Sequence, residues 1–156
     1  MASDPNDGFL FDLVIHSDPE LLCVVRGAVQ GIAEVAGLSE AECRCVTLAV
    51  DEAVANIIRH AYDCRRDQPI EVRCRRLPAH AAGRGRAALE FLLVDRGRSA
   101  DPAELQGRPL DQVRPGGLGM HFIRQSMDEV DYQACEDGNR LRLLKYLAPG
   151  NSRSGA

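Results

Sequence analysis

Hydrophobic and polar residues follow one another along this chain in patterns that predict short strands and helices of ordinary length. Residues 9–16 (FLFDLVIH) are mostly apolar and partly β-branched, as in a β-strand. Residues 88–94 are apolar at nearly every position, so we expect a central strand that is buried on both faces. The other predicted strands are 70–76, 129–135 and 140–147.

Two segments carry the start signals of helices. Ser17-Asp18-Pro19-Glu20 places a proline in the first turn and acids near the positive end of the helix dipole, which predicts a helix to about Ala36. Ser39 and Glu42 form a capping box, Ser-x-x-Glu, that opens a second helix to about His60. The apolar residues of this second helix recur at helical spacing and define its buried face: Val46, Ala49, Val50, Ala53, Val54 and Ile57.

The remaining segments are connections and one short helix. Residues 77–86 are rich in Pro, Gly and Ala without periodicity, which predicts a loop. Residues 96–115 form a long connection for a compact domain, and such loops often act as lids over a site. A short helix is expected at about 118–127, a hairpin turn at 136–139 and a frayed tail at 151–156.

The order of these elements favours an α+β fold. Because the strands are not interleaved one by one with helices, we expect a two-layer α/β sandwich with a mixed, mostly antiparallel sheet and helices on one face. The length of 156 residues suits one domain, over 1–150, better than two undersized ones. Hydrophobic residues make up 45% and charged residues 27%, a globular balance.

The net charge and the N-terminal residues limit the kinds of binding partner and the cellular compartment that we expect. The net charge of -4 offers no cationic field, so no direct nucleic-acid partner and no membrane are expected. Residues 1–8 are polar and acidic, unlike a signal peptide, and the apolar run 87–94 is too short to cross a bilayer. These features predict a cytoplasmic protein whose six cysteines are reduced.

A metal site built from cysteines is the sharper alternative for part of the chain. Cys43, Cys45, Cys64 and His60 carry suitable ligand atoms. Residues two apart on a helix point to different sides, so Cys43 and Cys45 do not converge easily. Ordinary core cysteines are the favoured interpretation.

The second predicted helix carries the first group of residues with chemistry. Glu52, Asn56 and His60 are spaced i, i+4 and i+8 and form one polar stripe beside the apolar face. A carboxylate next to an amide oxygen suits magnesium or a water held for deprotonation. A solvated helix flank, with His60 near the negative end of the dipole, is the alternative.

Two further groups follow the central strand. Asp95 ends this strand and can accept hydrogen bonds from an exocyclic amine, while Gly97 lets a flat ring approach the backbone. Residues 115–120 (PGGLGM) precede a helix, and their unobstructed amides with the helix dipole predict an anion site. An ordinary strand-ending turn and a flexible hinge are the respective alternatives.

In their order and separation these groups resemble the anti-sigma-factor serine kinases of the histidine-kinase-like (GHKL) ATPases. Residues 51–62 are similar to the family's asparagine box, and Asp95 and Gly97, with 101–102, to its first glycine box. Residues 116–119, leading to 127–130, are similar to the second glycine box. The resemblance covers about residues 10–147, including a closing strand at 138–147.

The resemblance implies ATP held between the helices and the lid, together with Mg²⁺. Asn56 would bind the metal ion, Asp95 the adenine amine, and Glu52 would act as general base toward a seryl hydroxyl. Gly97 would line the base pocket. The phosphates would be wrapped by the second glycine box: Gly116, Gly117, Leu118 and Gly119.

The chain departs from the family pattern at two places. Arg98-Ser99-Ala100 stands where an apolar or aromatic residue is often found, and Gly138-Asn139-Arg140 lacks a threonine or serine. Both departures bear on nucleotide affinity more than on the fold. Arg108 and Arg114, in the predicted lid, carry charge that suits phosphate, although solvated arginines are the ordinary interpretation.

The function implied is a serine/threonine protein kinase that phosphorylates an anti-sigma-factor antagonist and also sequesters a sigma factor. The family parallel also implies a homodimer. The alternative is a non-catalytic, nucleotide-dependent interaction module, although a pure binder needs no base such as Glu52. The detached ATP domain of a sensor histidine kinase is disfavoured, because no dimerisation helices are found and His16 lies on a predicted strand.

Overall fold

The computed structural model describes residues 8–101, 105 and 118–149. The strands of the described part are β1 (Phe9–His16), β2 (Pro69–Leu77), β3 (Ala88–Asp95), β4 (Glu129–Cys135) and β5 (Gly138–Tyr146). Its helices are the 3₁₀ turn η1 (Pro19–Leu21), α1 (Leu22–Val35), α2 (Glu40–Asn56), the π-helical turn η2 (Ile57–Ala61), α3 (Ala79–Ala82) and α5 (Gly119–Ser126). None of the helices described is both long and apolar enough to span a bilayer.

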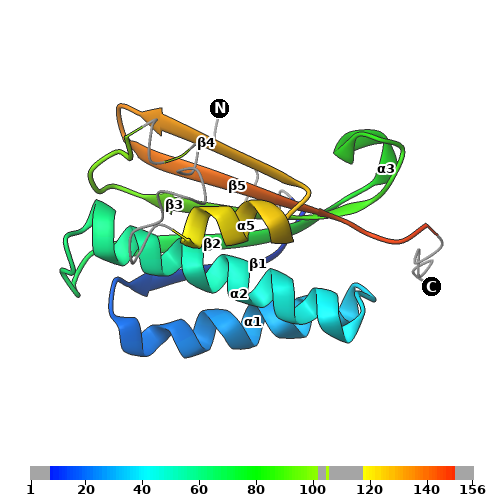
Figure 1. The fold of residues 1–156 in the computed structure, drawn as a ribbon, viewed down its shortest axis with the longest axis horizontal. Coiled ribbons are helices and arrows are strands. Elements are labelled where there is room, and N and C mark those ends of the chain that lie inside the picture. The colour runs from blue at the N-terminus through cyan, green and yellow to red at the C-terminus, as the bar shows by residue number, and fades with distance from the viewer. Residues whose placement is uncertain (1–7, 102–104, 106–117, 150–156) are drawn as a thin grey trace.

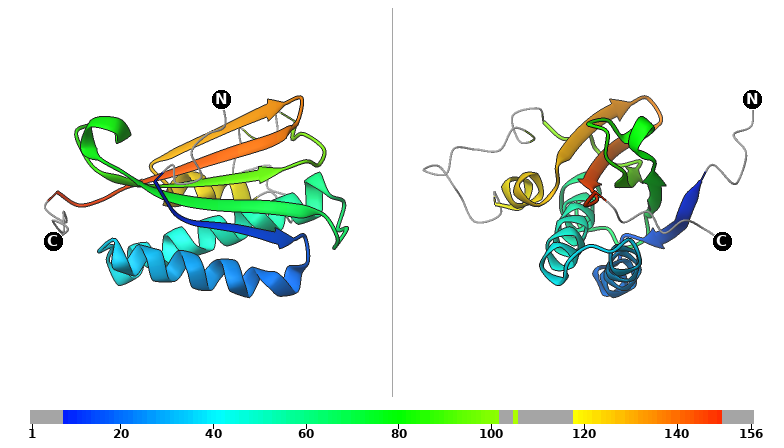
Figure 2. Two further views of the ribbon diagram at one scale, coloured as in Figure 1. Left: turned by 180° about the vertical axis from the view of Figure 1, so that it is seen from behind. Right: turned by 90° about the vertical axis from the view of Figure 1, so that its right-hand side faces the viewer.

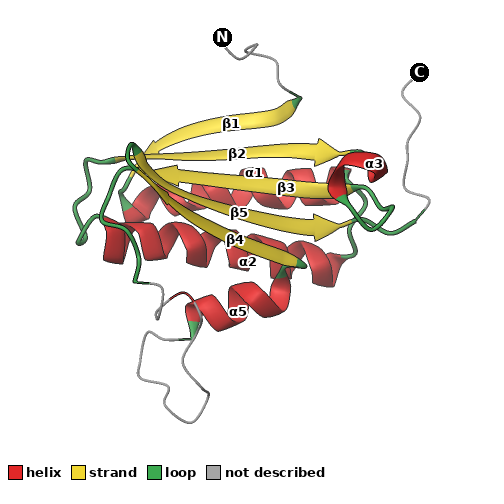
Figure 3. Ribbon diagram, turned by 90° about the horizontal axis from the view of Figure 1, so that it is seen from above, coloured by secondary structure: helices red, strands yellow, loops and turns green. Residues whose placement is uncertain are grey.

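The strands form one sheet in the order β1-β2-β3-β5-β4, and every neighbouring pair is antiparallel. Helices α1, α2 and α5 lie side by side beneath one face of this sheet (Figure 3). The sheet and the helices make two layers when the molecule is seen from the side (Figures 1 and 2). The predicted α+β sandwich with helices on one face is therefore confirmed.

The core lies between these two layers. Leu89, Phe91 and Leu93 are alternate residues of β3, so their side chains point to the same face of the sheet, and all three are fully buried. Val50 and Val54 of α2 belong to the same cluster of buried residues. The apolar face of β3 and the apolar face of α2 thus pack against each other, and this close packing fixes the position of α2 relative to the sheet.

The opposite face of β3 is buried by charged side chains rather than by a second apolar layer. Glu90 is 4% exposed because Arg75 of β2 and Arg142 of β5 pair with it from both sides. Leu92 and Val94 on this face are only half-buried. The prediction of a strand buried on both faces therefore holds only at the start of β3. There Ala88 packs with Ala82 of α3, Leu144 and Tyr146, and paired arginines shield Glu90.

Most element boundaries agree with those predicted, with two differences. Residues 79–82, expected in a loop, form the short helix α3, and the Tyr146 hydroxyl donates a hydrogen bond to the Ala82 carbonyl oxygen (3.1 Å). Strand β5 begins at Gly138, because Cys135 pairs with Gly138 across a tighter turn than expected. Residues 102–104 and 106–115 of the predicted lid, with Arg108 and Arg114, and the tail at 151–156 lie outside the described residues.

Candidate functional site

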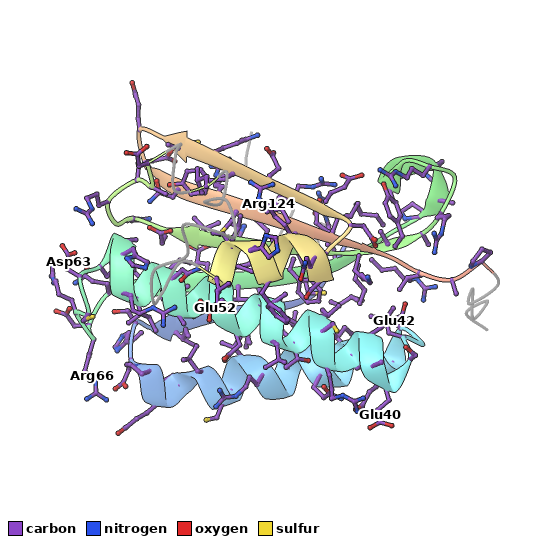
Figure 4. The ribbon with its side chains drawn as sticks, viewed as in Figure 1. Glu40, Glu42, Glu52, Asp63, Arg66 and Arg124 are labelled. Carbon is purple, nitrogen blue, oxygen red and sulfur yellow. The ribbon has the colours of Figure 1, made fainter. Side chains whose placement is uncertain are left out.

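The polar stripe predicted on the second helix is present for its first two residues. Glu52 and Asn56 lie on α2, and Figure 4 shows Glu52 on the side of α2 that faces α5. A single nitrogen, Nη2 of Arg59, donates to Glu52 Oε1 (2.8 Å) and to Asn56 Oδ1 (2.9 Å). The Glu52 carboxylate and the Asn56 amide oxygen therefore contact the same positively charged nitrogen.

Arg59, rather than His60, completes this stripe. The helix changes to a π-helical turn at Ile57, where the Tyr62 amide donates to the Ile57 carbonyl oxygen (3.0 Å). His60 is exposed, and its carbonyl oxygen accepts a hydrogen bond from Arg98. Sequence reasoning missed Arg59, although its spacing of i+7 from Glu52 and i+3 from Asn56 places it on the same helical face.

The N-terminus of α5 approaches this cluster closely. A β-carbon added to Gly119 would lie 2.2 Å from Glu52 Oε1, so only a glycine allows this approach with Glu52 in its present position. An open pocket of about 260 Å³ lies here, lined by Glu52, Arg59, Leu118, Gly119 and Phe122. Of the predicted second glycine box, Leu118 and Gly119 are thus placed beside Glu52.

The other two predicted residues of that box, Gly116 and Gly117, lie outside the described residues. The anion site proposed for residues 115–120 is therefore described only at its C-terminal end, where α5 begins at Gly119.

Asp95 ends β3 at the other end of the candidate site, and it is 5% exposed. Its Oδ1 accepts hydrogen bonds from the Gly97 amide (2.8 Å) and from Asn139 Nδ2 (2.8 Å). Burial raises the pKa of the Asp95 carboxyl above its usual value, although these two hydrogen bonds act in the opposite direction. Both of these hydrogen bonds go to the same carboxylate oxygen, Oδ1.

Gly97 packs against the end of the asparagine-box helix. A β-carbon at Gly97 would lie 2.4 Å from the carbonyl oxygen of Ala61, so the two backbones meet at a distance that only glycine permits. The Arg98 amide donates to the same oxygen (2.9 Å). The Tyr62 hydroxyl accepts from the Arg96 amide (2.8 Å) and donates to the Pro69 carbonyl oxygen (2.7 Å). These contacts join the two boxes, which are distant in sequence.

Asn139 is a second residue that sequence reasoning did not assign to the site. It is 2% exposed and pairs with Asp95 across the β3–β5 ladder. Besides Asp95, its Nδ2 donates to the Gly97 carbonyl oxygen (3.1 Å), and its Oδ1 accepts from the Ser99 hydroxyl (2.8 Å). The sequence placed Asn139 in a predicted hairpin turn, where asparagine is common, so the local pattern did not single it out.

The residues that depart from the family pattern anchor the loop after β3. The Arg98 amide is bound to Ala61, Ser99 is bound to Asn139, and the Ala100 amide donates to the Tyr132 hydroxyl of β4 (2.9 Å). Each of the three therefore ties the loop to a different element.

The cysteines do not assemble into a metal centre. On α2, Cys43 is 1% exposed and points into the core, whereas Cys45 is exposed, as residues two apart on a helix require. Within residues 8–101, 105 and 118–149, no group of three or more His, Cys, Asp or Glu side chains is arranged to hold a metal ion.

Comparison with known proteins agrees with this geometry. Residues 15–145 match the family model described as the histidine kinase-like ATPase domain. The chain is 30% identical over 146 residues to the serine-protein kinase RsbW of Bacillus pumilus, covering 88% of this chain and 86% of the relative. It is 30% identical over 108 residues to the serine/threonine-protein kinase BtrW of Bordetella bronchiseptica, covering 67% and 70%.

A solved structure supports the fold. A chain in the SiaB–SiaC complex of Pseudomonas aeruginosa has a TM-score of 0.61 at 17% identity, covering 88% of this chain and 89% of that one. The relatives named above are protein serine/threonine kinases, the class of enzyme that the sequence predicts. The predicted family is confirmed: this chain belongs to the histidine kinase-like ATPase domain family.

Proposed function

We propose that this chain is an ATP-dependent serine/threonine protein kinase that regulates a partner protein. The observation that carries the proposal is the convergence of Glu52 Oε1 and Asn56 Oδ1 on one cationic nitrogen beside the start of α5. Kinase activity in the RsbW and BtrW relatives supports it. A carboxylate in this position can act as a general base, which a module that only binds nucleotide does not need.

The residues at the end of β3 fit the adenine base of ATP. The Oδ2 atom of Asp95 would accept a hydrogen bond from the exocyclic amine, while Oδ1 is held by Gly97 and Asn139. Gly97 lies two residues beyond Asp95, where its amide donates to Asp95 Oδ1, and the family resemblance implies that it lines the base pocket. We assign base recognition to Asp95 and Gly97 on these grounds.

The oxygens on α2 fit Mg²⁺, with Asn56 as the proposed ligand. Carboxylate and amide oxygens are hard ligands, and a magnesium site commonly uses one or two protein groups together with the phosphates. Magnesium bound there would neutralise charge on the phosphates of ATP. We further propose that the backbone of Gly116, Gly117, Leu118 and Gly119 wraps these phosphates, as the family resemblance implies.

Glu52 is the proposed general base. Its carboxylate accepts the proton of a seryl hydroxyl on the partner while the seryl oxygen forms a bond to the γ-phosphorus. The bond from that phosphorus to the β,γ-bridging oxygen breaks, and ADP leaves with the electron pair. Glu52 is 30% exposed beside the open pocket, so a side chain of another protein has access to it.

The proposed partners are an anti-sigma-factor antagonist, as the phosphorylated substrate, and a sigma factor that the chain sequesters. We also propose that the chain works in the cytoplasm as a homodimer and that residues 1–150 act as one domain. One cluster of buried residues that joins β1, α1, α2, β3 and α5 supports the single domain.

The test is phosphorylation of a candidate antagonist with radiolabelled ATP by the parent chain and by Glu52→Gln. We expect the rate to fall by about a hundredfold to ten-thousandfold, while calorimetric titration shows unchanged ATP binding. Glu40→Gln is the matched control, because Glu40 lies on the same helix (Figure 4), is exposed and is paired with Arg44. If Glu52→Gln phosphorylates as fast as the parent, Glu52 is not the base.

A non-catalytic interaction module is the second candidate. The contact between Glu52 and Arg59 favours it, because Glu52 Oε1 already accepts a hydrogen bond from Arg59 Nη2 (2.8 Å). The same assay separates the two functions: a module binds ATP and its partner but leaves no labelled serine.

A further inference from the structure

We propose that Arg59 is a built-in counter-cation that competes with Mg²⁺ for Asn56, pairs with the neighbouring Glu52, and supports the phosphates when the metal ion is missing. This inference rests on the proposed function, because it concerns the same nucleotide site. It assigns a role to a residue that the sequence motifs did not single out.

The contacts of Arg59 are those expected of a cation in a binding site. One nitrogen, Nη2, lies 2.8 Å from Glu52 Oε1 and 2.9 Å from Asn56 Oδ1. A point charge between a carboxylate and an amide oxygen is the environment that a hard metal ion also requires. Two such oxygens cannot hold a guanidinium nitrogen and a metal ion at the same point, so one cation must leave when the other binds.

An ordinary surface ion pair has a different geometry in this chain. Arg44 and Glu40, four residues apart on the same helix, are 60% and 87% exposed and lie outside the pocket. Arg59 instead reaches back to a glutamate seven residues earlier, and that glutamate is 30% exposed. Arg59 and Glu52 also both line the pocket beside Gly119. The Arg59 contact is therefore part of the site and not of the outer helix surface.

Released from the two oxygens, the guanidinium remains in the pocket with its charge intact. Its side chain is 47% exposed and lines the open pocket, so the guanidinium is accessible to a ligand there. Guanidinium groups bind phosphate oxygens through paired N–H donors, which makes phosphate the natural acceptor within reach. Without Mg²⁺, Arg59 neutralises part of the phosphate charge, and with Mg²⁺ it competes for the protein ligands. Both effects reduce the advantage that magnesium gives to nucleotide binding.

The test measures how strongly ATP binding depends on magnesium. Calorimetric titration gives the Kd of ATP in the presence of Mg²⁺ and in the presence of EDTA, for the parent chain, Arg59→Ala and Arg59→Lys. The ratio of the Kd in EDTA to the Kd in Mg²⁺ is expected to rise about tenfold or more in Arg59→Ala, which is the size of one charge-assisted hydrogen bond. Arg59→Lys keeps the charge without the planar fork and should give an intermediate ratio.

Arg44→Ala is the control, because it removes the same charge about four turns earlier on the helix. Its ratio should equal that of the parent chain. A purely structural role of Arg59 would weaken ATP binding equally in Mg²⁺ and in EDTA. An unchanged ratio in both Arg59→Ala and Arg59→Lys would therefore overturn this inference. The proposed function would still stand in that case, provided that the parent chain binds ATP. If the parent chain binds no ATP in either condition, the proposed function fails and this inference fails with it.

Discussion

Asn139 donates a hydrogen bond of 2.8 Å to Asp95 Oδ1 although the two residues are 44 positions apart in sequence. Both side chains are almost fully buried, at 2% and 5% exposure. The amide of Asn139 thereby orients the carboxylate on which the proposed recognition of adenine depends. It also supplies one of the two hydrogen bonds that oppose the rise in the pKa of Asp95 caused by burial.

Replacing Asn139 with alanine should therefore affect both stability and binding. The buried Asp95 carboxylate loses a donor, which costs about 1–3 kcal/mol of unfolding free energy. The pKa of Asp95 should rise further, because a hydrogen bond to its charged form is removed. Urea denaturation and calorimetric titration with ATP measure the two effects.

Gln133→Ala is the control for Asn139→Ala, because Gln133 carries an exposed amide on the adjacent strand β4. Gln133→Ala should change neither the unfolding free energy nor the affinity for ATP measurably. If Asn139→Ala is as stable as the parent chain and binds ATP equally well, the orienting role of Asn139 is wrong.

Gly97→Ala should destabilise the loop after β3. The new β-carbon would lie 2.4 Å from a backbone oxygen of Ala61, which cannot move without distorting the π-helical turn. Overpacking of this kind costs about 1–3 kcal/mol. We expect a lower midpoint of urea denaturation and weaker ATP binding, since the base pocket shares this contact.

Gly27 provides the matched comparison, because it lies in α1 with no atom within 4 Å of an added β-carbon. Gly27→Ala should stabilise the chain by about 0.5–1 kcal/mol, since glycine is a poor helix former. A Gly97→Ala variant that is as stable as Gly27→Ala would contradict the close contact with Ala61.

Glu90→Gln should reveal a pH-dependent contribution to stability. Burial acts to raise the pKa of Glu90, but hydrogen bonds from Arg75 and Arg142 outweigh it and lower the pKa below its usual value. A carboxyl whose pKa is lowered by folding stabilises the native state above its unfolded pKa, and this stabilisation is lost as the pH falls through the folded value.

The loss in Glu90→Gln should therefore be largest near neutral pH, at about 1.5–3 kcal/mol. It should shrink as the pH falls below about 4.5, the usual pKa of a glutamate, and through the lowered pKa of Glu90 in the folded chain. Urea denaturation of both proteins across this range measures the difference. Glu136→Gln, in the exposed hairpin, should show little loss at any pH. A difference between Glu90→Gln and the parent that stays constant with pH would contradict the lowered pKa.

The elements of the fold followed from local sequence to a large extent. Residues 9–16, which are apolar and partly β-branched, and residues 129–135 were predicted as strands at the bounds that the structure has. The capping box at Ser39 and Glu42 predicted the start of α2. These signals are strong because each depends on residues close together in the chain. The short helix α3 was missed because alanines next to proline and glycine give no periodic pattern.

The candidate site was predicted only as separate pieces. Glu52, Asn56, Asp95 and Gly97 could be named because each stands in a recognisable local pattern. Their partners could not, since the contact of Gly97 with Ala61 and that of Asp95 with Asn139 join segments that are distant in sequence. The shielding of Glu90 by two arginines likewise depends on strands that become neighbours only in the folded sheet.

By itself, then, the sequence determined most of the segments that form helices and strands, the family that the chain resembles and the side chains that are candidates for the chemistry. Those features are local, because they depend on the spacing of apolar residues and on capping and turn residues. The tertiary structure alone decided that Gly119 of α5 lies against Glu52 and that Asn139 holds Asp95. The reason is physical: hydrogen bonds and close backbone contacts require distances of about 3 Å, and only the packing of α2, α5 and the sheet brings these atoms that near.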